Sequence, residues 1–543
     1  MSRDDDPGPD PLPSSARLGT LLFALPPAGR RWSSGLRAAA AFALPALLSA
    51  AAGYQDAVLS VMFGAFAVLY GEGRAYRVRA RVVGAAGAAL LSAVCLGALT
   101  GQAVPAGMAG GLAQTALLTA VAVAAVFVID ALRLGPPGAL FFVLACAGAM
   151  VAARSGQSLL LLLGGTALGV AGSLVAAMAG AIVEPGKPER MAVEAAERAT
   201  RTYQGLRAQP TAAVARYAAA EAVSSAWEVL YDGGQPDRSP SSPLVARLLA
   251  VHRALAGVGD ETGTTTTEMP VARPTIGFRL RRSLSSRSHA TVTAVRVAVA
   301  CASAGTLDAV IGSAHPHWAI LAALIVLQTG SDRIRAKVRG IHRLVGTLIG
   351  LALFGGLAQL SPTGYELIAI LAVLQFATEL FVPRNYAVAA VFITPMALFA
   401  GGAANTSDLG GLLNDRLVET VIGVVLAVSA LYLVLPRAHR RTVLWTEQRV
   451  RTAAQRLLDR LAESTVEATG MTLRRDLQYE LIGCVRGGTE AASNDPRWTA
   501  PRWRAHRYLV HEGYDLLGAC WTVADDGRVP ATERWTRVFG AGY

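Results

Sequence analysis

Arginines at the start of apolar stretches are the residues of this sequence best suited to binding a ligand. Arg81 and Arg343 each precede a glycine by three residues, Gly84 and Gly346, where such a stretch begins. A guanidinium binds a carboxylate through two parallel hydrogen bonds, so this pair could attract organic anions. The alternative is that both arginines anchor a helix end and set its orientation, the commoner role of arginine beside an apolar segment.

Two further arginines, Arg37 and Arg296, also lie at the start of apolar stretches. They are candidates for the same anion. The alternative is that their long side chains extend along the helix to the membrane surface.

Asp308 lies well inside an apolar stretch, twelve residues after Arg296. An ionisable side chain inside a membrane helix is costly, and it is by default a candidate for binding a proton or a substrate. We therefore predict that Asp308 carries a coupling proton. The alternative is that it reaches the outer membrane surface near Gly312 and His315.

Glu419 and Thr420 lie three and four residues after Arg416, early in the last apolar stretch. Side chains with this spacing share a helix face. Glu419 and Thr420 are therefore candidates for substrate binding or coupling, and the alternative for Glu419 is a local ion pair with Arg416.

The sequence offers little evidence for metal binding, phosphate binding or catalysis. His315 and His317 are too few ligands for a metal site. The stretch from Gly180 to Lys187 is similar to a phosphate-binding loop, but its spacing is wrong, and Pro188 stands where Ser or Thr would bind Mg²⁺. No nucleophile–base pair stands out. We expect no cofactor, no metal and no enzymatic activity.

The segments that carry these residues are membrane helices. Of the 543 residues, 53% are hydrophobic and only 16% are charged, against about 25% charged in soluble domains. A membrane-spanning helix needs roughly 20 apolar residues. The first half of the chain has six such segments, at 37–53, 55–71, 81–100, 111–130, 138–153 and 157–183. The second half has six more, at 291–311, 316–330, 343–360, 364–381, 386–402 and 415–436.

The distribution of arginine predicts the orientation of these spans. With twelve spans, the basic loops all fall on one side; they include Arg74, Arg77, Arg79 and Arg81, and Arg333, Arg335, Lys337, Arg339 and Arg343. Loops 101–110 and 402–414, on the other side, contain no Lys or Arg. The positive-inside rule then places both termini and residues 185–288 in the cytoplasm. The net charge of +12 is explained largely by these loops, so we expect no nucleic-acid partner.

The two halves match each other in sequence. Residues Arg37, Gly53, Gly71 and Arg74 precede Arg296, Gly312, Gly330 and Arg333 by 259 residues in every case. After a three-residue insertion, Arg81-x-x-Gly84 is matched with Arg343-x-x-Gly346, and Thr166-x-x-Gly169 is matched with Thr420-x-x-Gly423. Because each half has an even number of spans, the copies share one orientation, with a pseudo-twofold axis along the membrane normal.

The predicted fold class is an all-α membrane protein of about twelve transmembrane helices, arranged as two parallel six-helix repeats, each followed by a helical cytoplasmic region. The predicted domains are a disordered N-terminus (1–36), the first repeat (37–185), a helical region (186–259), a flexible linker (260–288), the second repeat (289–436) and a helical C-terminal region (437–543).

Two motifs of the second half resemble a known family. They are Arg343-Leu-Val-Gly346-Thr347-Leu-Ile-Gly350 and Arg416-Leu-Val-Glu419-Thr420-Val-Ile-Gly423, which are similar to patterns of the fusaric-acid-resistance-like family, also called the aromatic acid exporter family. In the first half, Ala85 follows Gly84, and Gly165-Thr166 lacks the preceding Arg and Glu. The resemblance implies a protein of the bacterial inner membrane that exports aromatic carboxylic acids or related compounds.

Three functions remain open from the sequence. The first is a secondary transporter that exports an organic anion or an amphipathic compound, driven by the proton gradient because no ATPase motif is present. The second is a passive organic-anion channel, and the third is a membrane scaffold whose cytoplasmic helices bind a partner. The expected partners are the lipid bilayer and a small organic anion, and homo-oligomerisation stays open. Arg supplies 48 of the 50 basic residues, which is typical of a GC-rich bacterial genome.

Overall fold

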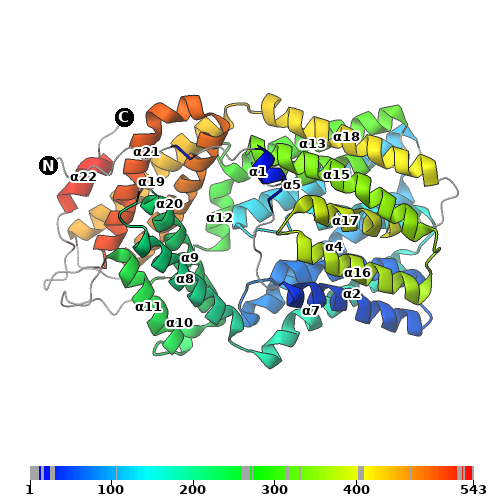
Figure 1. Ribbon diagram of the computed structural model, residues 1–543, viewed down its shortest axis with the longest axis horizontal. Helices are drawn as coiled ribbons and strands as arrows, with labels where there is room; N and C mark the ends of the chain where they lie inside the picture. The colour runs from blue at the N-terminus through cyan, green and yellow to red at the C-terminus, as the bar shows by residue number, and fades with distance from the viewer. Residues whose placement is uncertain are drawn as a thin grey trace.

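The computed structural model describes residues 12–13, 18–24, 31–105, 107–209, 211–257, 269–271, 273–312, 317–328, 330, 332–400, 409–463, 468–521, 529 and 532–540. All regular elements in these residues are helices (Figure 1). The predicted all-α class is therefore confirmed.

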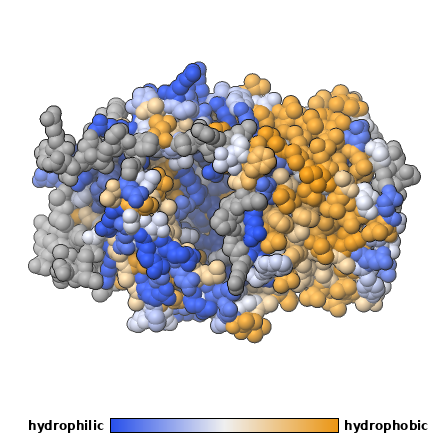
Figure 2. Space-filling model, in the orientation of Figure 1, coloured by the Kyte–Doolittle hydropathy of each residue, from blue (hydrophilic) through white to orange (hydrophobic). Residues whose placement is uncertain are grey.

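Eight helices are long and apolar enough to cross a membrane. They are α2 (Trp32–Ala51), α4 (Tyr76–Ala103), α5 (Met108–Leu132), α7 (Leu159–Val183), α13 (His289–Ile311), α15 (Arg333–Ala358), α16 (Gly364–Phe381) and α18 (Leu409–Leu433). At 1.5 Å per residue the shortest spans about 27 Å and the longest about 42 Å, against roughly 30 Å of bilayer hydrocarbon. Figure 2 shows a broad apolar surface over this part of the molecule, with hydrophilic surface at either end. The chain is a multi-pass membrane protein.

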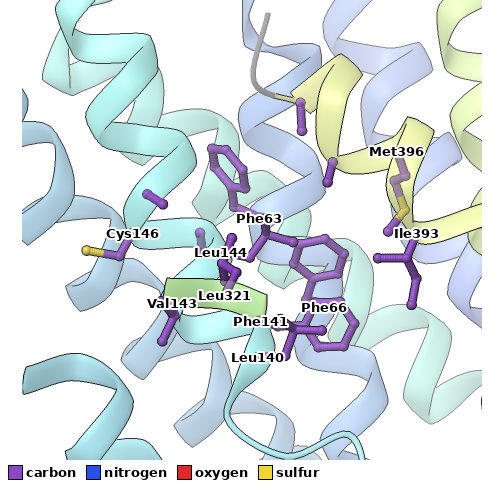
Figure 3. Close-up of a cluster of buried hydrophobic side chains, with 14 of the residues drawn as sticks. Phe63, Phe66, Leu140, Phe141, Val143, Leu144, Cys146, Leu321, Ile393 and Met396 are labelled. Atoms are coloured by element: carbon purple, nitrogen blue, oxygen red, sulfur yellow. The ribbon is translucent and has the colours of Figure 1, made fainter. Parts of the chain in front are cut away.

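Four shorter apolar helices fill the interior of this membrane region. They are α3 (Val58–Ala65), continued by the 3-10 helix η3 (Phe66–Gly71), α6 (Leu140–Arg154), α14 (His317–Leu327) and α17 (Tyr386–Ala400). Every residue of α14 is buried, as are eleven of the fifteen residues of α6. Their side chains form one apolar cluster, in which the rings of Phe66 and Phe141 lie 4.3 Å apart (Figure 3). Each of the twelve predicted spans therefore contains a helix, but four helices are too short to cross a bilayer alone.

The long and short helices pack in matched pairs. In the first half α4 packs on α6 and α3 packs on α7; in the second half α15 packs on α17 and α14 packs on α18. The halves meet through two further pairs, α13 on α5 and α2 on α16. The first helix of each half thus packs on the fourth helix of the other half.

The remaining helices form an extramembrane region at one end of the membrane helices (Figure 1). They are α8 (Lys187–Gly205), α9 (Ala212–Gly233), α10 (Gln235–Arg238), α11 (Pro243–Ala256), α12 (Ile276–Ser283), α19 (Ala438–Glu463), α20 (Ala468–Asn494), α21 (Pro496–Ala519) and α22 (Thr532–Gly540). Two buried apolar clusters stabilise it, one around Trp227 on α9 and one around Leu481 on α20. Contacts of α9 with α20 and of α11 with α21 join its two parts.

Two segments expected to lack structure contain helices. The linker prediction for 260–288 missed α12, whose Arg279 donates a hydrogen bond to the carbonyl of Leu132 at the end of α5, 3.0 Å away. Residues 258–268 and 272 lie outside the described residues.

In the N-terminal segment 1–36, α2 already begins at Trp32, and α1 (Leu18–Leu22) packs on α15. The carbonyl of Leu22 accepts hydrogen bonds from Asn385 (3.3 Å) and lies 3.0 Å from the imidazole Nε2 of His342. Most of residues 1–30 lie outside the part of the chain that the structure describes.

Candidate anion site in the membrane region

Two arginines are buried in the interior of the second half. Arg343 on α15 and Arg416 on α18 are each 1% exposed, and they are the largest fully buried side chains among the described residues. Arg343 lies ten residues into α15, about 15 Å from the end that faces the extramembrane region. Arg416 lies seven residues into α18, which runs in the opposite direction. Each arginine therefore lies about 10–15 Å from one end of its helix, inside the membrane region.

Close helix packing fixes the orientation of these side chains. A Cβ atom on Gly346 would lie 2.5 Å from the carbonyl oxygen of Ala387, so α15 and α17 approach closely at this position. Gly423 brings α18 equally close to the backbone of Ala319 on α14. Small residues of this kind allow membrane helices to pack backbone to backbone. Gly346 is therefore a packing residue at the contact of α15 with α17.

An aromatic ring and charged side chains surround the two guanidinium groups, but several of their nitrogen atoms have no hydrogen-bond partner among the described residues. The guanidinium of Arg416 lies 4.5 Å from the centre of the Trp318 ring, a cation–π distance. Arg416 also lies within electrostatic range of Arg343 and Glu419. Among the described residues, Nε and Nη1 of both arginines have no hydrogen-bond partner, and the buried hydroxyl of Thr347 has none.

This arrangement is suited to an anion. Two guanidinium groups and one carboxylate leave a net positive charge in the membrane interior. A buried cation is costly unless an opposite charge and hydrogen bonds compensate it. A carboxylate bound between Arg343 and Arg416 would supply both, because each guanidinium can donate two parallel hydrogen bonds to it.

Thr420 has a structural explanation. It is fully buried, and its hydroxyl donates a hydrogen bond to the carbonyl of Arg416, 2.7 Å away. Thr166 on α7 makes the same bond, 2.7 Å long, to the carbonyl of Leu162. The matched threonines therefore satisfy their hydroxyls within their own helices.

The expected pairing of Arg81 with Arg343 is wrong. Arg81 is exposed, five residues into α4, whereas Arg343 is buried. A Cβ on Gly87 would meet Val170 of α7, and a Cβ on Gly340 would meet Val424 of α18. Val170 corresponds to Val424, because Thr166 corresponds to Thr420 four residues earlier in each helix. Gly87 therefore corresponds to Gly340, and α4 matches α15 at an offset of 253 residues. Leu90, which is also buried, therefore occupies the position that corresponds to Arg343.

Arg296 and Arg37 have partners within the protein. Arg296 is 2% exposed, and it donates hydrogen bonds to the carbonyls of Val434 and Leu435, both 3.1 Å away, after the end of α18. Arg37 is half-buried and lies 3.6 Å from the carboxylate of Glu72. These contacts favour structural roles over anion binding.

Asp308 lies near the end of α13 and is 1% exposed. The next residue, Ala309, packs against Gly111 of α5, and Gly305 packs against Thr115 of α5 and Ile320 of α14. Asp308 is thus enclosed at a helix junction. Among the described residues its Oδ2 atom has no hydrogen-bond partner. His315, named as a possible neighbour, lies outside the described residues.

Sequence reasoning did not assign a binding role to Arg416 or Trp318. Arg416 opens the motif that contains Glu419 and Thr420, at the start of the predicted stretch 415–436, and this motif was the signal for it. Trp318 carried no comparable signal, because its contact with Arg416 depends on how α14 packs on α18.

The fold and this site define a multi-pass helical membrane protein with a buried cationic centre. Residues 292–430, which contain most of α13 and α14–α17 and the cationic centre on α15 and α18, match the family model described as fusaric acid resistance protein-like. The resemblance inferred from the motifs is confirmed, and the second half of the membrane region is the part that matches this family.

Curated relatives are similar over part of the chain. The uncharacterized membrane protein YvaC of Bacillus subtilis is 29% identical over 161 residues, which are 29% of this chain and 25% of the relative. The inner membrane protein YccS of Escherichia coli is 27% identical over 191 residues, 35% of this chain and 26% of the relative. The uncharacterized protein YhfK of Escherichia coli is 28% identical over 149 residues, 27% of this chain and 21% of the relative. The matched part is thus about a quarter of each relative's length. No solved structure matches the chain.

Proposed function

We propose that this protein is a secondary transporter of the bacterial inner membrane that exports organic anions, with aromatic carboxylates as the leading class. The observation that carries the proposal is the pair of buried arginines, Arg343 and Arg416, in the interior of the membrane region. Intramembrane arginines are rare and commonly mark a substrate path. Transport, rather than catalysis, is the function that such a site supports.

We further propose that the membrane region consists of two six-helix repeats with twelve spans. The support is the matched packing: α4–α6 with α15–α17, α3–α7 with α14–α18, and the reciprocal pairs α13–α5 and α2–α16. A parallel repeat with a pseudo-twofold axis along the membrane normal would give this pattern. An even number of spans in each half also agrees with the position of both extramembrane parts at one end (Figure 1). The arginine-rich loops lie at that end, so we assign it, and both termini, to the cytoplasm.

The short helices support a binding role for the centre of the molecule. In transporters built from repeats, unusually short apolar segments at corresponding positions of the two halves commonly form the binding site. Here the second and fifth helices of each half are the short ones. Two of them, α14 and α17, approach Arg416: Trp318 on α14 lies 4.5 Å from its guanidinium, and Tyr386 on α17 lies within electrostatic range of it. The indole of Trp318 offers an aromatic face beside the guanidinium of Arg416, which suits an anion that has a ring next to its carboxylate.

The proposal is tested by flux in proteoliposomes loaded with radiolabelled benzoate. We expect efflux down an imposed proton gradient from the wild-type protein, and its loss in Arg343→Gln and in Arg416→Gln. Arg81→Gln is the matched control, because Arg81 is exposed at the start of its helix, and it should transport normally. Equal flux in all three variants would contradict the proposal.

The same assay separates a transporter from a passive channel. A channel would conduct benzoate at a rate that follows the benzoate gradient and the membrane potential, whatever the pH difference. A transporter coupled to protons would accumulate benzoate against its gradient when a pH difference is applied, above the level that liposomes without the protein reach.

A further inference from the structure

A second cationic site lies outside the membrane region, in a cavity of about 160 Å³ between the two parts of the extramembrane region. Helices α9, α11, α20 and α21 line it, and the ends of α5 and α12 close it on the membrane side. Seven arginines contribute to its wall, but only one acidic residue, Glu228. A wall with this charge balance attracts anions.

Several of these arginines are already neutralised. Arg216 lies 2.7 Å from Asp515, and Arg273 lies 3.0 Å from Asp232. Arg74 and Arg475 also have carboxylate partners.

The other three arginines of the wall, Arg133, Arg279 and Arg474, have no carboxylate within salt-bridge distance among the described residues. Arg133 packs on the ring of Tyr479, with its guanidinium 3.9 Å from the ring centre. Arg279 is 7% exposed and donates a hydrogen bond to a backbone carbonyl, and its Nε atom has no partner within the part of the chain that the structure describes.

Arg474 is the group that a ligand would satisfy best. It is 4% exposed, its Nη1 atom donates a hydrogen bond to the sulfur of Met471, 3.3 Å away, and its guanidinium also interacts with the thiol of Cys520. Its Nε and Nη2 atoms have no hydrogen-bond partner among the described residues. Two adjacent guanidinium N–H groups without partners match the two oxygens of a carboxylate.

The rest of the wall near Arg474 is aromatic. The rings of His252 and Trp521 lie 4.5 Å apart, and the guanidinium of Arg474 lies 5.6 Å from the centre of the Trp521 ring. Burial and the neighbouring Arg474 lower the pKa of His252 to about 4, so its imidazole is neutral at physiological pH. The indole N–H of Trp227 donates to Nδ1 of His252, 3.0 Å away, which leaves the proton of the neutral ring on Nε2. The cavity thus combines aromatic faces with an unpaired cation.

We propose that this cavity binds a small organic monoanion, a single aromatic ring with a carboxylate, and that Arg474 holds the carboxylate. The size agrees with this class, because a cavity of about 150 Å³ is sufficient for one benzene ring. The site is separate from Arg343 and Arg416, and its occupancy can be measured without transport. The proposal therefore stands independently of the proposed function.

The test is isothermal titration of the purified full-length protein with benzoate, in the Arg343→Gln/Arg416→Gln background so that the membrane site does not contribute. We expect one benzoate per chain, no binding of the neutral analogue benzamide, and binding weakened about tenfold or more by Arg474→Gln, since a charge-assisted hydrogen bond is lost. Arg198→Gln, at an exposed arginine of α8, is the control and should bind as the background does.

A second variant keeps the test decisive if Arg474→Gln fails to fold. Ser224→Phe fills the cavity from α9 and removes no charge, so it should abolish benzoate binding while thermal unfolding stays cooperative. Absence of benzoate binding at millimolar concentration, equal binding of benzamide, or unchanged binding in both variants would overturn the proposal.

Discussion

The two halves of the membrane region pack their helices in the same pairs, but they differ in what lies at the centre of each half. Around α15 and α18, buried positions carry Arg343, Arg416 and Glu419. In the first half, aligned by the packing of Gly87 and Gly340 and by Thr166 with Thr420, the corresponding residues are Leu90, Leu162 and Gly165. The same framework is therefore charged in one half and apolar in the other.

This difference separates the residues that both halves need for helix packing from those that are available to bind a ligand. Residues shared by both halves, such as Thr166 and Thr420, satisfy their own helices. Residues present in one half only are not needed to build the framework. The family match, which covers 292–430, falls on the charged half.

The largest effect is expected when the second half is given the residues of the first. Arg343→Leu combined with Arg416→Leu should lower benzoate flux at least about 100-fold, since two charge-assisted hydrogen bonds of about 1.5–3 kcal/mol each are lost. Stability should be unchanged or higher, because replacing buried charges by apolar side chains is often neutral or favourable. Flux and thermal unfolding of the same preparation measure both outcomes, and substantial remaining flux would break the comparison.

Asp308 sharpens the comparison, because its counterpart at the offset of 259 residues is Ser49. Asp308→Asn and Asp308→Ser should fold and insert normally, but they should lose flux driven by a pH gradient while they still exchange benzoate between equal pools. The reason is that only a carboxyl can carry the coupling proton. Gradient-driven flux that matches the wild type in both variants would remove Asp308 from the coupling mechanism.

The reverse substitution places a charge in the apolar half. Leu90→Arg buries a guanidinium on α4, and it should lower the stability or the yield of inserted protein by about 2.5–3.5 kcal/mol, the cost of an arginine at the centre of a membrane helix. Leu90→Met is the control of similar volume. Equal unfolding temperatures for the two variants would show that the first half also accommodates a cation.

The smallest effect is expected at the glycines of the two Arg-x-x-Gly motifs. Gly346→Ala should cost about 1–3 kcal/mol, because the new methyl group meets the backbone of Ala387. Gly84→Ala has open space around its Cβ position and should be neutral. Thermal unfolding in detergent would compare them, and similar losses at both sites would mean that the motifs do pack alike.

Much of the fold could be predicted from the sequence, because apolarity and arginine position are strong signals for membrane helices. All twelve predicted segments contain helices. The pairing of Arg81 with Arg343 failed because an Arg-x-x-Gly match is easily found in a chain rich in Ala, Gly and Arg, and only packing contacts give the register. Helix α12 was missed because its sequence is short and polar.

The sites were harder to predict. Arg343 was predicted as a candidate anion-binding residue. The burial of Arg416 could not be predicted, because it depends on which face of α18 packs on α14. Asp308 was placed either in the substrate path or at the outer surface, and sequence alone does not show that α5 and α14 enclose it. The extramembrane cavity joins residues between Arg74 and Trp521 in the chain, and no local pattern connects them.

Locating a bound anion would show whether an organic anion binds between Arg343 and Arg416. Diffraction from crystals soaked in 4-bromobenzoate would show bromine by its anomalous scattering. We expect a bromine peak within the second half of the membrane region, beside Trp318 and the two guanidinium groups, and its loss in Arg343→Leu/Arg416→Leu crystals. Bromine bound in the membrane region away from these arginines, or a peak beside Trp318 that persists in the double variant, would contradict the proposed binding between the two arginines.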